Sequence, residues 1–224
     1  MKVVRLGQAG LLFRTESACV LVDPYFSDGA YAVSGVHRKK PVPSIAWDLR
    51  PDLLLITHDH VDHYDPETVP AFVNETTSVT VLSPDSVWRK IRSAGGNNNF
   101  VRMEPGVTWT EKGVSVTALP ARHSDPYAIG FGLEAEGRRI LITGDTLLDL
   151  GWKIPERFRN PDFLFLPING RGNNMNAADA ASLAKAVGAR HAVPVHYGML
   201  DDCSPDAFVC ESKAVLEDGV EYEI

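Results

Sequence analysis

The decisive stretch of this 224-residue chain is Leu53-Leu54-Leu55-Ile56-Thr57, followed without a break by His58-Asp59-His60-Val61-Asp62-His63. A continuous apolar run of this length predicts a short strand that is buried on both faces. Histidine and carboxylate side chains are common ligands of divalent metals. Crowded together and removed from water, these groups would be unfavourable without a cation. The stretch therefore predicts a metal site at the end of a buried strand.

The spacing inside this motif predicts where its side chains point. His58 and His60 are two residues apart, so in an extended segment their rings leave the backbone on the same side. Asp62 and His63 follow where the chain must turn, and we expect them to face a second point a short distance away. Asp59 is expected to point away from both histidines and to lie outside the ligand set.

Three further candidate ligands each follow a predicted strand, and these strands span residues 114–119, 139–143 and 192–195. The candidates are His123, Asp145 and His196. A side chain at a strand terminus can point into a rim shared with neighbouring strands. We therefore expect these residues to join those of the first motif in one site.

The rest of the chain alternates short strands with a few helices. Further strands are predicted at 3–6, 10–14, 18–22, 79–82, 107–110, 127–135 and 163–168, and helices at 84–92, 177–187 and 204–218. Residues 27–44 hold glycines and prolines and are expected to be irregular. With no linker or repeat between these elements, the pattern predicts sheet layers covered by helices in a single domain over residues 1–224.

The composition limits the class of function. Apolar residues make up 44% of the chain, which is typical of a globular domain. The net charge is −7, which disfavours nucleic-acid binding. No apolar run is long enough to span a membrane, so no membrane partner is expected. Three cysteines without a Cys-x-x-Cys spacing predict a reducing, cytoplasmic location. The oligomeric state is left open, a homo-oligomer included.

The whole motif set resembles the metallo-β-lactamase superfamily. The likeness rests on His58-x-His60-x-Asp62-His63, then His123, the pair Gly144-Asp145, and His196, and on the early turn Leu21-Val22-Asp23-Pro24. The resemblance implies an α/β fold, the four-layer αββα sandwich, with metals at one edge between the two sheets. It also implies that His58, His60 and His123 hold one metal. Asp62, His63 and His196 would hold the other, with Asp145 bridging the two.

Two divalent cations are therefore the expected cofactors. A ligand set of nitrogen and oxygen atoms suits Zn²⁺ best, while Mn²⁺ and Fe²⁺ also tolerate such sites. Asp23 has two interpretations that the sequence leaves open. It either accepts a hydrogen bond from the free N–H of a ligating histidine, or it initiates an ordinary Asp-Pro turn.

The predicted activity is metal-dependent hydrolysis. A metal-activated hydroxide would attack a small anionic lactone or ester, a sugar-phosphate lactone included, with Asp62 and Asp145 as the catalytic carboxylates. The pieces 38–43, 57–65, 167–171 and 174–176 are similar to the L-ascorbate-6-phosphate lactonase-like branch, although this chain is short for such an enzyme. A phosphodiesterase or nuclease using the same metals is the alternative. A non-catalytic metal-binding module is a third, which the complete ligand set disfavours.

Substrate contacts are predicted from the local clustering of cations in an acidic chain. His37, Arg38 and Lys39 lie in the irregular segment, and Asn169 and Arg171 follow a predicted strand. Arginine and lysine both suit a phosphate or carboxylate group. The competing interpretation is that residues 38–40 are a solvated charge run and that His37 has no catalytic role.

Overall fold

Two β-sheets form the centre of the molecule, in a computed structural model that describes all 224 residues. The first sheet has the strand order β13-β1-β2-β3-β4-β5-β6, and the second has the order β12-β11-β10-β9-β8-β7. The first contains β1 (Lys2–Gly7), β2 (Gly10–Arg14), β3 (Cys19–Val22), β4 (Leu53–Leu55), β5 (Thr80–Ser83), β6 (Asn99–Arg102) and β13 (Glu221–Glu223). The second contains β7 (Thr108–Glu111), β8 (Val114–Pro120), β9 (Ile129–Ala135), β10 (Arg138–Ile142), β11 (Phe163–Pro167) and β12 (His191–Val195).

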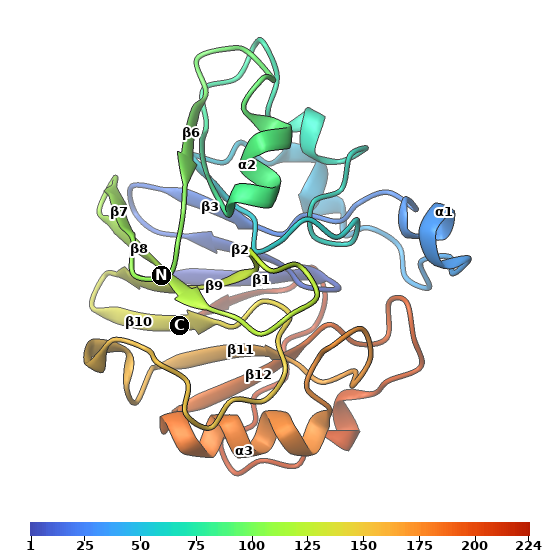
Figure 1. Cartoon of the computed structure of the whole chain (residues 1–224), viewed down its shortest axis with the longest axis vertical. Coiled ribbons are helices and arrows are strands. Elements are labelled where there is room, and N and C mark those ends of the chain that lie inside the picture. Colours follow the sequence, from blue (N-terminus) through green and yellow to red (C-terminus); the bar gives the residue numbers. More distant parts are fainter.

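Helices cover the outer faces of both sheets (Figure 1). The α-helices are α1 (Ala30–Ser34), α2 (Asp85–Ile91) and α3 (Ala177–Val187). Short 3₁₀ helices are η1 (Ser44–Asp48), η2 (Val69–Ala71), η3 (Glu156–Phe158) and η4 (Pro205–Ala207). Helix α2 lies on the first sheet and α3 on the second, while α1 projects from one side of the molecule. This confirms the predicted four-layer αββα sandwich. None of the helices has the length and apolar character needed to cross a membrane.

Three apolar clusters hold the layers together. The largest has 23 buried residues and fills the space between the sheets, where Phe13 and Phe165 meet edge to face with ring centroids 5.6 Å apart. The second lies between the first sheet and α2, and the third between the second sheet and α3. Successive strand residues point to opposite faces, so an apolar strand such as β4 contributes to the central cluster and to an outer one.

The ends of the longest helix follow the predicted signals. The side chain of Asn176 accepts hydrogen bonds from the backbone N–H groups of Ala178 and Asp179, and Asp179 completes a capping box. Gly188 ends α3 in a left-handed conformation with φ 71°. The apolar stripe between these caps packs on the second sheet, as predicted.

The helix predicted over residues 204–218 is wrong. Only η4, a single turn, forms at its start, and the following residues form turns and two isolated β-bridges, from Lys213 to Ala192 and from Asp218 to Arg5. The backbone N–H of Ala192 donates to Ser212 O at 2.7 Å, and that of Gly219 donates to Arg5 O at 2.8 Å. Pairing with β12 and β1 satisfies backbone groups that a helix would have satisfied internally. The structure also contains β6, β13 and α1, which the sequence pattern did not predict.

The topology brings the carboxyl ends of four strands to one edge of the sandwich. Strands β8 and β10 are both antiparallel to β9, so they run in the same direction, and β12 runs parallel with β10 through β11. Strand β4 of the first sheet ends at the same edge, where Ile129 N donates to Thr57 O at 3.0 Å. Each candidate ligand follows one of these four strands.

Candidate metal centre

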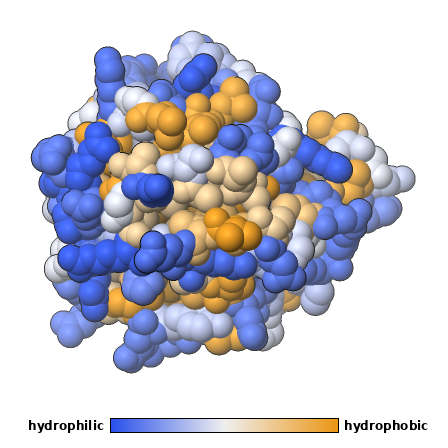
Figure 2. All heavy atoms as spheres, turned by 90° about the horizontal axis from the view of Figure 1, so that it is seen from below, coloured by the Kyte–Doolittle hydropathy of each residue, from blue (hydrophilic) through white to orange (hydrophobic).

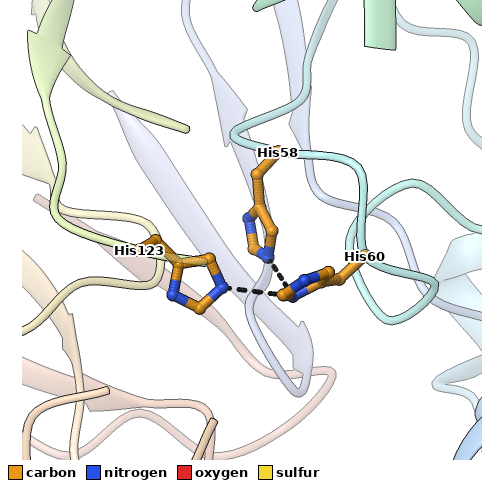
Figure 3. A group of neighbouring side chains, drawn as sticks. All are labelled: His58, His60 and His123. Carbon is orange, nitrogen blue, oxygen red and sulfur yellow. Dashed lines mark hydrogen bonds between the residues drawn. The ribbon is translucent and has the colours of Figure 1, made fainter. Parts of the chain in front are cut away.

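Three histidines form the first group at this edge (Figure 3). His58 Nε2 lies 3.0 Å from His60 Nδ1, and His123 Nε2 lies 3.1 Å from the same atom. His58 is fully buried, and the other two are half-buried. Burial lowers the pKa of His58 well below its usual value and also lowers that of His123. Three imidazole nitrogens therefore lie close together, and such nitrogens are donors that a divalent metal binds.

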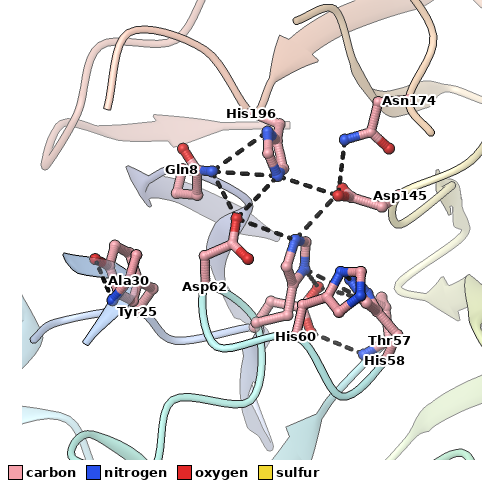
Figure 4. A network of polar contacts seen from close by, with 12 residues as sticks. Gln8, Tyr25, Ala30, Thr57, His58, His60, Asp62, Asp145, Asn174 and His196 are labelled. Atoms are coloured by element: carbon pink, nitrogen blue, oxygen red, sulfur yellow. Dashed lines mark hydrogen bonds and ion pairs between the residues drawn. The ribbon is translucent and has the colours of Figure 1, made fainter. Parts of the chain in front are cut away.

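Two carboxylates and two histidines form the second group (Figure 4). His196 Nε2 lies 3.1 Å from Asp62 Oδ2 and 3.1 Å from Asp145 Oδ2. His63 Nε2 lies 3.4 Å from Asp145 Oδ1. Asp145 also stands within 4.8 Å of the ligand atoms of His58 and His63, so it adjoins both groups. The structure thus brings all seven predicted ligands together, with Asp145 next to one histidine of each triad; the bridging role that the resemblance implies for Asp145 stays a prediction.

A glycine allows the two sheets to meet here. Gly144 has φ +60°, and a Cβ at this position would lie 2.9 Å from Ile129 O and 3.0 Å from the Thr57 Cβ. Any larger residue would force β10 away from β4. The glycine therefore places Asp145 beside the histidines that follow β4.

Asp23 holds one of the histidines in place. His63 Nδ1 lies 2.8 Å from Asp23 Oδ2, and Asp23 Oδ1 accepts a hydrogen bond from Thr57 N at 2.8 Å. Both Asp23 and His63 are fully buried. Of the two interpretations of Asp23, this geometry matches the histidine partner. It turns His63 Nε2 toward the carboxylates of the second group.

The donor set fits a cation. His63 Nε2 is buried and has no hydrogen-bond partner. A buried polar atom without a partner is unfavourable, and a divalent ion between this nitrogen and the adjacent carboxylates would satisfy it. The seven residues offer only nitrogen and oxygen atoms, in line with the expected divalent metals.

Two side-chain amides that sequence reasoning missed contact the carboxylates. Gln8 Nε2 donates to Asp62 Oδ2 at 2.8 Å, and Asn174 Nδ2 donates to Asp145 Oδ2 at 2.7 Å. The backbone carbonyl of Gln8 also accepts from His196 N at 2.8 Å. The only sequence signal for Gln8 is a lone polar residue in an apolar hairpin. Asn174 belongs to a segment that supported the family resemblance without an assigned role.

We predict that Gln8→Met weakens metal binding at the second group. Methionine fills the buried space but cannot hold the Asp62 carboxylate, and loss of such a partner typically lowers metal affinity about 10- to 100-fold. Zinc titration by calorimetry would measure the affinity of each site. The first group serves as an internal control, because its histidines do not contact Gln8. Wild-type affinity at both sites would contradict a positioning role for this amide.

A cleft of about 750 Å³ opens onto both groups. Asn169 and Arg171, both predicted to contact substrate, line it together with His60, Asp62 and Asp145. Asn169 Oδ1 is buried and has no hydrogen-bond partner within the protein. The cleft therefore combines the predicted metal ligands with a cation and an amide.

The other predicted substrate contacts do not line this cleft. The Arg38 guanidinium donates to the backbone carbonyls of Ser27 and Lys40 within its own segment and to that of Tyr25, just before it, at 3.1 Å. His37 pairs with Asp28, and Lys39 pairs with Asp202. These contacts give the three residues a structural role in the segment. Substrate binding by His37, Arg38 and Lys39 stays a prediction without support from the geometry.

Asp59 points away from the histidines, as expected. Its carboxylate accepts a hydrogen bond at 2.7 Å from Nζ of Lys90, which belongs to α2. It is therefore outside both groups of candidate ligands.

The chain matches a family model and several known proteins along most of its length. Residues 19–197 match the family model described as the beta-lactamase superfamily domain. A UPF0173 metal-dependent hydrolase of Methanospirillum hungatei is 27% identical, covering 100% of this chain and 99% of that protein. The N-acyl-phosphatidylethanolamine-hydrolyzing phospholipase D 1 of Caenorhabditis elegans is 28% identical over 86% of this chain and 62% of its own length.

Solved structures show the same fold at low identity. The isothiocyanate hydrolase from Delia radicum gut bacteria superposes with a TM-score of 0.75 at 18% identity, covering 100% of this chain and 99% of that one. The diiron β-hydroxylase of Streptomyces venezuelae superposes with a TM-score of 0.66 at 18% identity, over 88% of this chain and 45% of its own. One fold thus serves different reactions, so the fold alone does not define the substrate.

The chain belongs to the metallo-β-lactamase superfamily. Within it, the chain is a metal-dependent hydrolase, like the relatives that match it over their full length.

Proposed function

We propose that the protein is a dinuclear hydrolase of small anionic lactones or esters, a sugar-phosphate lactone included. One observation carries the proposal: two triads of candidate ligands, with Asp145 close to His58 of the first and His63 of the second, adjoin a cleft lined by Arg171. Zn²⁺ is our preferred metal for both triads, with Mn²⁺ and Fe²⁺ as alternatives. The lactonase-like branch of the superfamily is supported by Asn169 and Arg171, which belong to its shared segment and line the cleft.

Each triad would hold one cation. His58, His60 and His123 would hold one cation, and Asp62, His63 and His196 the other, with Asp145 between them. Divalent cations at such a site supply Lewis acidity, which ionises a water nucleophile near neutral pH and stabilises the oxyanion.

Asp62 and Arg171 would act on the water and the substrate. Gln8 Nε2 donates to Asp62 Oδ2. Asp62 Oδ1 is therefore the oxygen left to accept a hydrogen bond from the water and to orient it. Arg171 would bind the anionic group of the substrate, and Asn169 would hydrogen-bond to a neighbouring polar group.

We expect Arg171→Ala to raise KM about tenfold for an anionic lactone and to leave KM for a neutral lactone unchanged. The guanidinium is exposed, so added salt should shrink the difference by screening the charge. Steady-state kinetics on a 6-phosphosugar lactone and on its unphosphorylated counterpart would measure both values. Arg138→Ala is the matched control, because Arg138 is an exposed arginine at the start of β10, at the opposite edge of the sheet. An equal increase in KM for both lactones would contradict the proposal of an anionic substrate but would not affect the proposed metal centre.

A phosphodiesterase is the second candidate. The Caenorhabditis elegans relative supports it, since its name states hydrolysis of a phospholipid. Hydrolysis of bis-p-nitrophenyl phosphate by the zinc-loaded protein at a higher kcat/KM than any lactone would favour this activity. The net charge of −7 makes a long polyanion such as RNA an unfavourable substrate for either enzyme.

A further inference from the structure

One wall of the cleft is apolar. It consists of aliphatic residues from three segments that are far apart in sequence: Ala30, Val33 and Val36 in and after α1, Val61 in the loop after β4, and Leu200 after β12. Beneath it lies a small buried cluster of Tyr25, Ala30 and Met199, against which Val61 and Leu200 pack. This cluster is separate from the three that hold the layers together. Of the wall residues, Ala30 belongs to this cluster, and Val61 and Leu200 pack against it.

The opposite wall is polar. The polar part of the lining includes Asn169, Arg171 and the residues 172–174, and Arg171 is the only arginine of the cleft. In Figure 4, Asn174 of this segment lies across Asp62 and Asp145 from Ala30. The carboxylates of Asp62 and Asp145 also line the cleft, and in Figure 4 they lie between Ala30 and Asn174; this part of the lining is called the floor below. A ligand whose reactive group lies over this floor would therefore meet aliphatic side chains on one side and a cation on the other.

Helix α1 gives the apolar wall its exposed outer part. Figure 2 shows apolar residues on the projection at the right, which is the side from which α1 extends in Figure 1. Val33 is 78% exposed, although valine side chains are usually buried. An aliphatic group on a ligand would cover this surface and remove it from water.

We propose that the substrate is two-sided, with an aliphatic substituent against the α1 wall and a polar or anionic group at Arg171. This rests on the proposed hydrolase function and narrows its substrate class to alkyl-substituted lactones or esters. The floor positions the scissile carbonyl between the two groups. A fully polar sugar lactone would leave the α1 wall exposed to water.

A series of neutral lactones tests the apolar wall. We expect kcat/KM of the zinc-loaded protein to rise about two- to fourfold per added methylene from γ-butyrolactone to γ-octalactone, as burial of aliphatic groups predicts. Val33→Asn should raise KM for γ-octalactone about three- to tenfold and leave that for γ-butyrolactone unchanged. Leu200→Asn, a change deeper in the same wall, should have the same selective effect.

Val209→Asn is the matched control. Val209 is 83% exposed and lies outside this cleft, so the change removes an equally exposed valine elsewhere. Its kinetics should equal those of the wild type. Absence of a chain-length effect, or equal losses on both lactones in Val33→Asn, would overturn the proposal. The proposal would also be overturned if the wild-type protein sedimented as a dimer and Val33→Asn as a monomer, because the apolar wall would then contact a second copy of the chain.

Binding measurements separate this proposal from the proposed function. Acetate and hexanoate resemble the product end of a short and a long ester, and calorimetry measures their binding without turnover. If no lactone or ester is hydrolysed but hexanoate binds more tightly than acetate, and Val33→Asn removes the difference, the hydrolase proposal fails and the apolar subsite stands. Equal binding of both carboxylates to the wild type overturns the subsite.

Discussion

Asp145→Asn should lower kcat/KM at least about a hundredfold and reduce the zinc content from two ions per chain to about one. Asp145 Oδ2 lies 3.1 Å from His196 Nε2, and Oδ1 lies 3.4 Å from His63 Nε2. The asparagine side chain would have to accept from Asn174 Nδ2 with its only oxygen, which turns its NH₂ group toward the histidines. The change therefore removes one negative charge and one ligand atom. Mutating a residue that only hydrogen-bonds to a metal ligand typically lowers metal affinity or activity 10- to 100-fold, and we expect the loss of the ligand itself to have a larger effect.

Metal analysis and kinetics on the same preparation would measure both effects. Asp162→Asn is the matched control, because Asp162 is equally buried but precedes β11 at the opposite edge of the sheet. That variant should keep two zinc ions and wild-type activity if it folds, which circular dichroism would establish for both proteins. Full activity and full metal content in Asp145→Asn would rule out a shared carboxylate.

The second large effect is a difference in pH dependence between the two triads. In the metal-free protein burial disfavours the charged form of His196, but the carboxylates of Asp145 and Asp62 outweigh it and raise the pKa of His196 to about 10. Against the same burial, these carboxylates raise the pKa of His63 well above its usual value. Burial lowers the pKa of His58. At neutral pH the second triad is therefore protonated, whereas the buried histidine of the first is not.

When a metal must displace a proton from a ligand, the affinity for the metal rises about tenfold per pH unit until the pH reaches the pKa of that ligand. The affinity of the second triad should therefore rise up to about a hundredfold per pH unit between pH 6.5 and 8.5, and that of the first triad should change little above pH 7. Zinc titrations in two buffers of different ionisation enthalpy would count the protons released. Equal proton release at both triads would contradict this assignment of charges.

The stability of the metal-free protein should depend on the same histidines, but it should fall as the pH rises, whereas the metal affinity rises. The folded-state pKa of His196 lies above its unfolded value, so its ion pairs stabilise the metal-free protein fully below about pH 6.5, and that contribution is lost as the pH rises toward 10. A bound cation replaces these protons. The increase in Tm on adding zinc should therefore grow from pH 7 to pH 9. An increase that shrinks over this range would mean that metal does not replace the protons.

Much of the site was predictable because its signals are local. Histidines two residues apart after a buried apolar run, and a Gly-Asp pair after another strand, combine residue chemistry with position in a strand, and both can be read along the chain. The same local periodicity predicted the strands and the capped helix α3. It failed for residues 204–218, because pairing with the neighbouring strands outweighed the intrinsic helical signals.

The sequence by itself determined the fold class and the set of candidate metal ligands. Only the tertiary structure decided which groups meet around them: Gln8 beside Asp62, Asn174 beside Asp145, and Arg38 bound to its own segment instead of facing the cleft. The apolar wall is another such result, since its residues come from three distant segments. Strand periodicity and residue chemistry are encoded locally. The partner of a side chain depends on how remote segments pack, and no pattern along the chain specifies that.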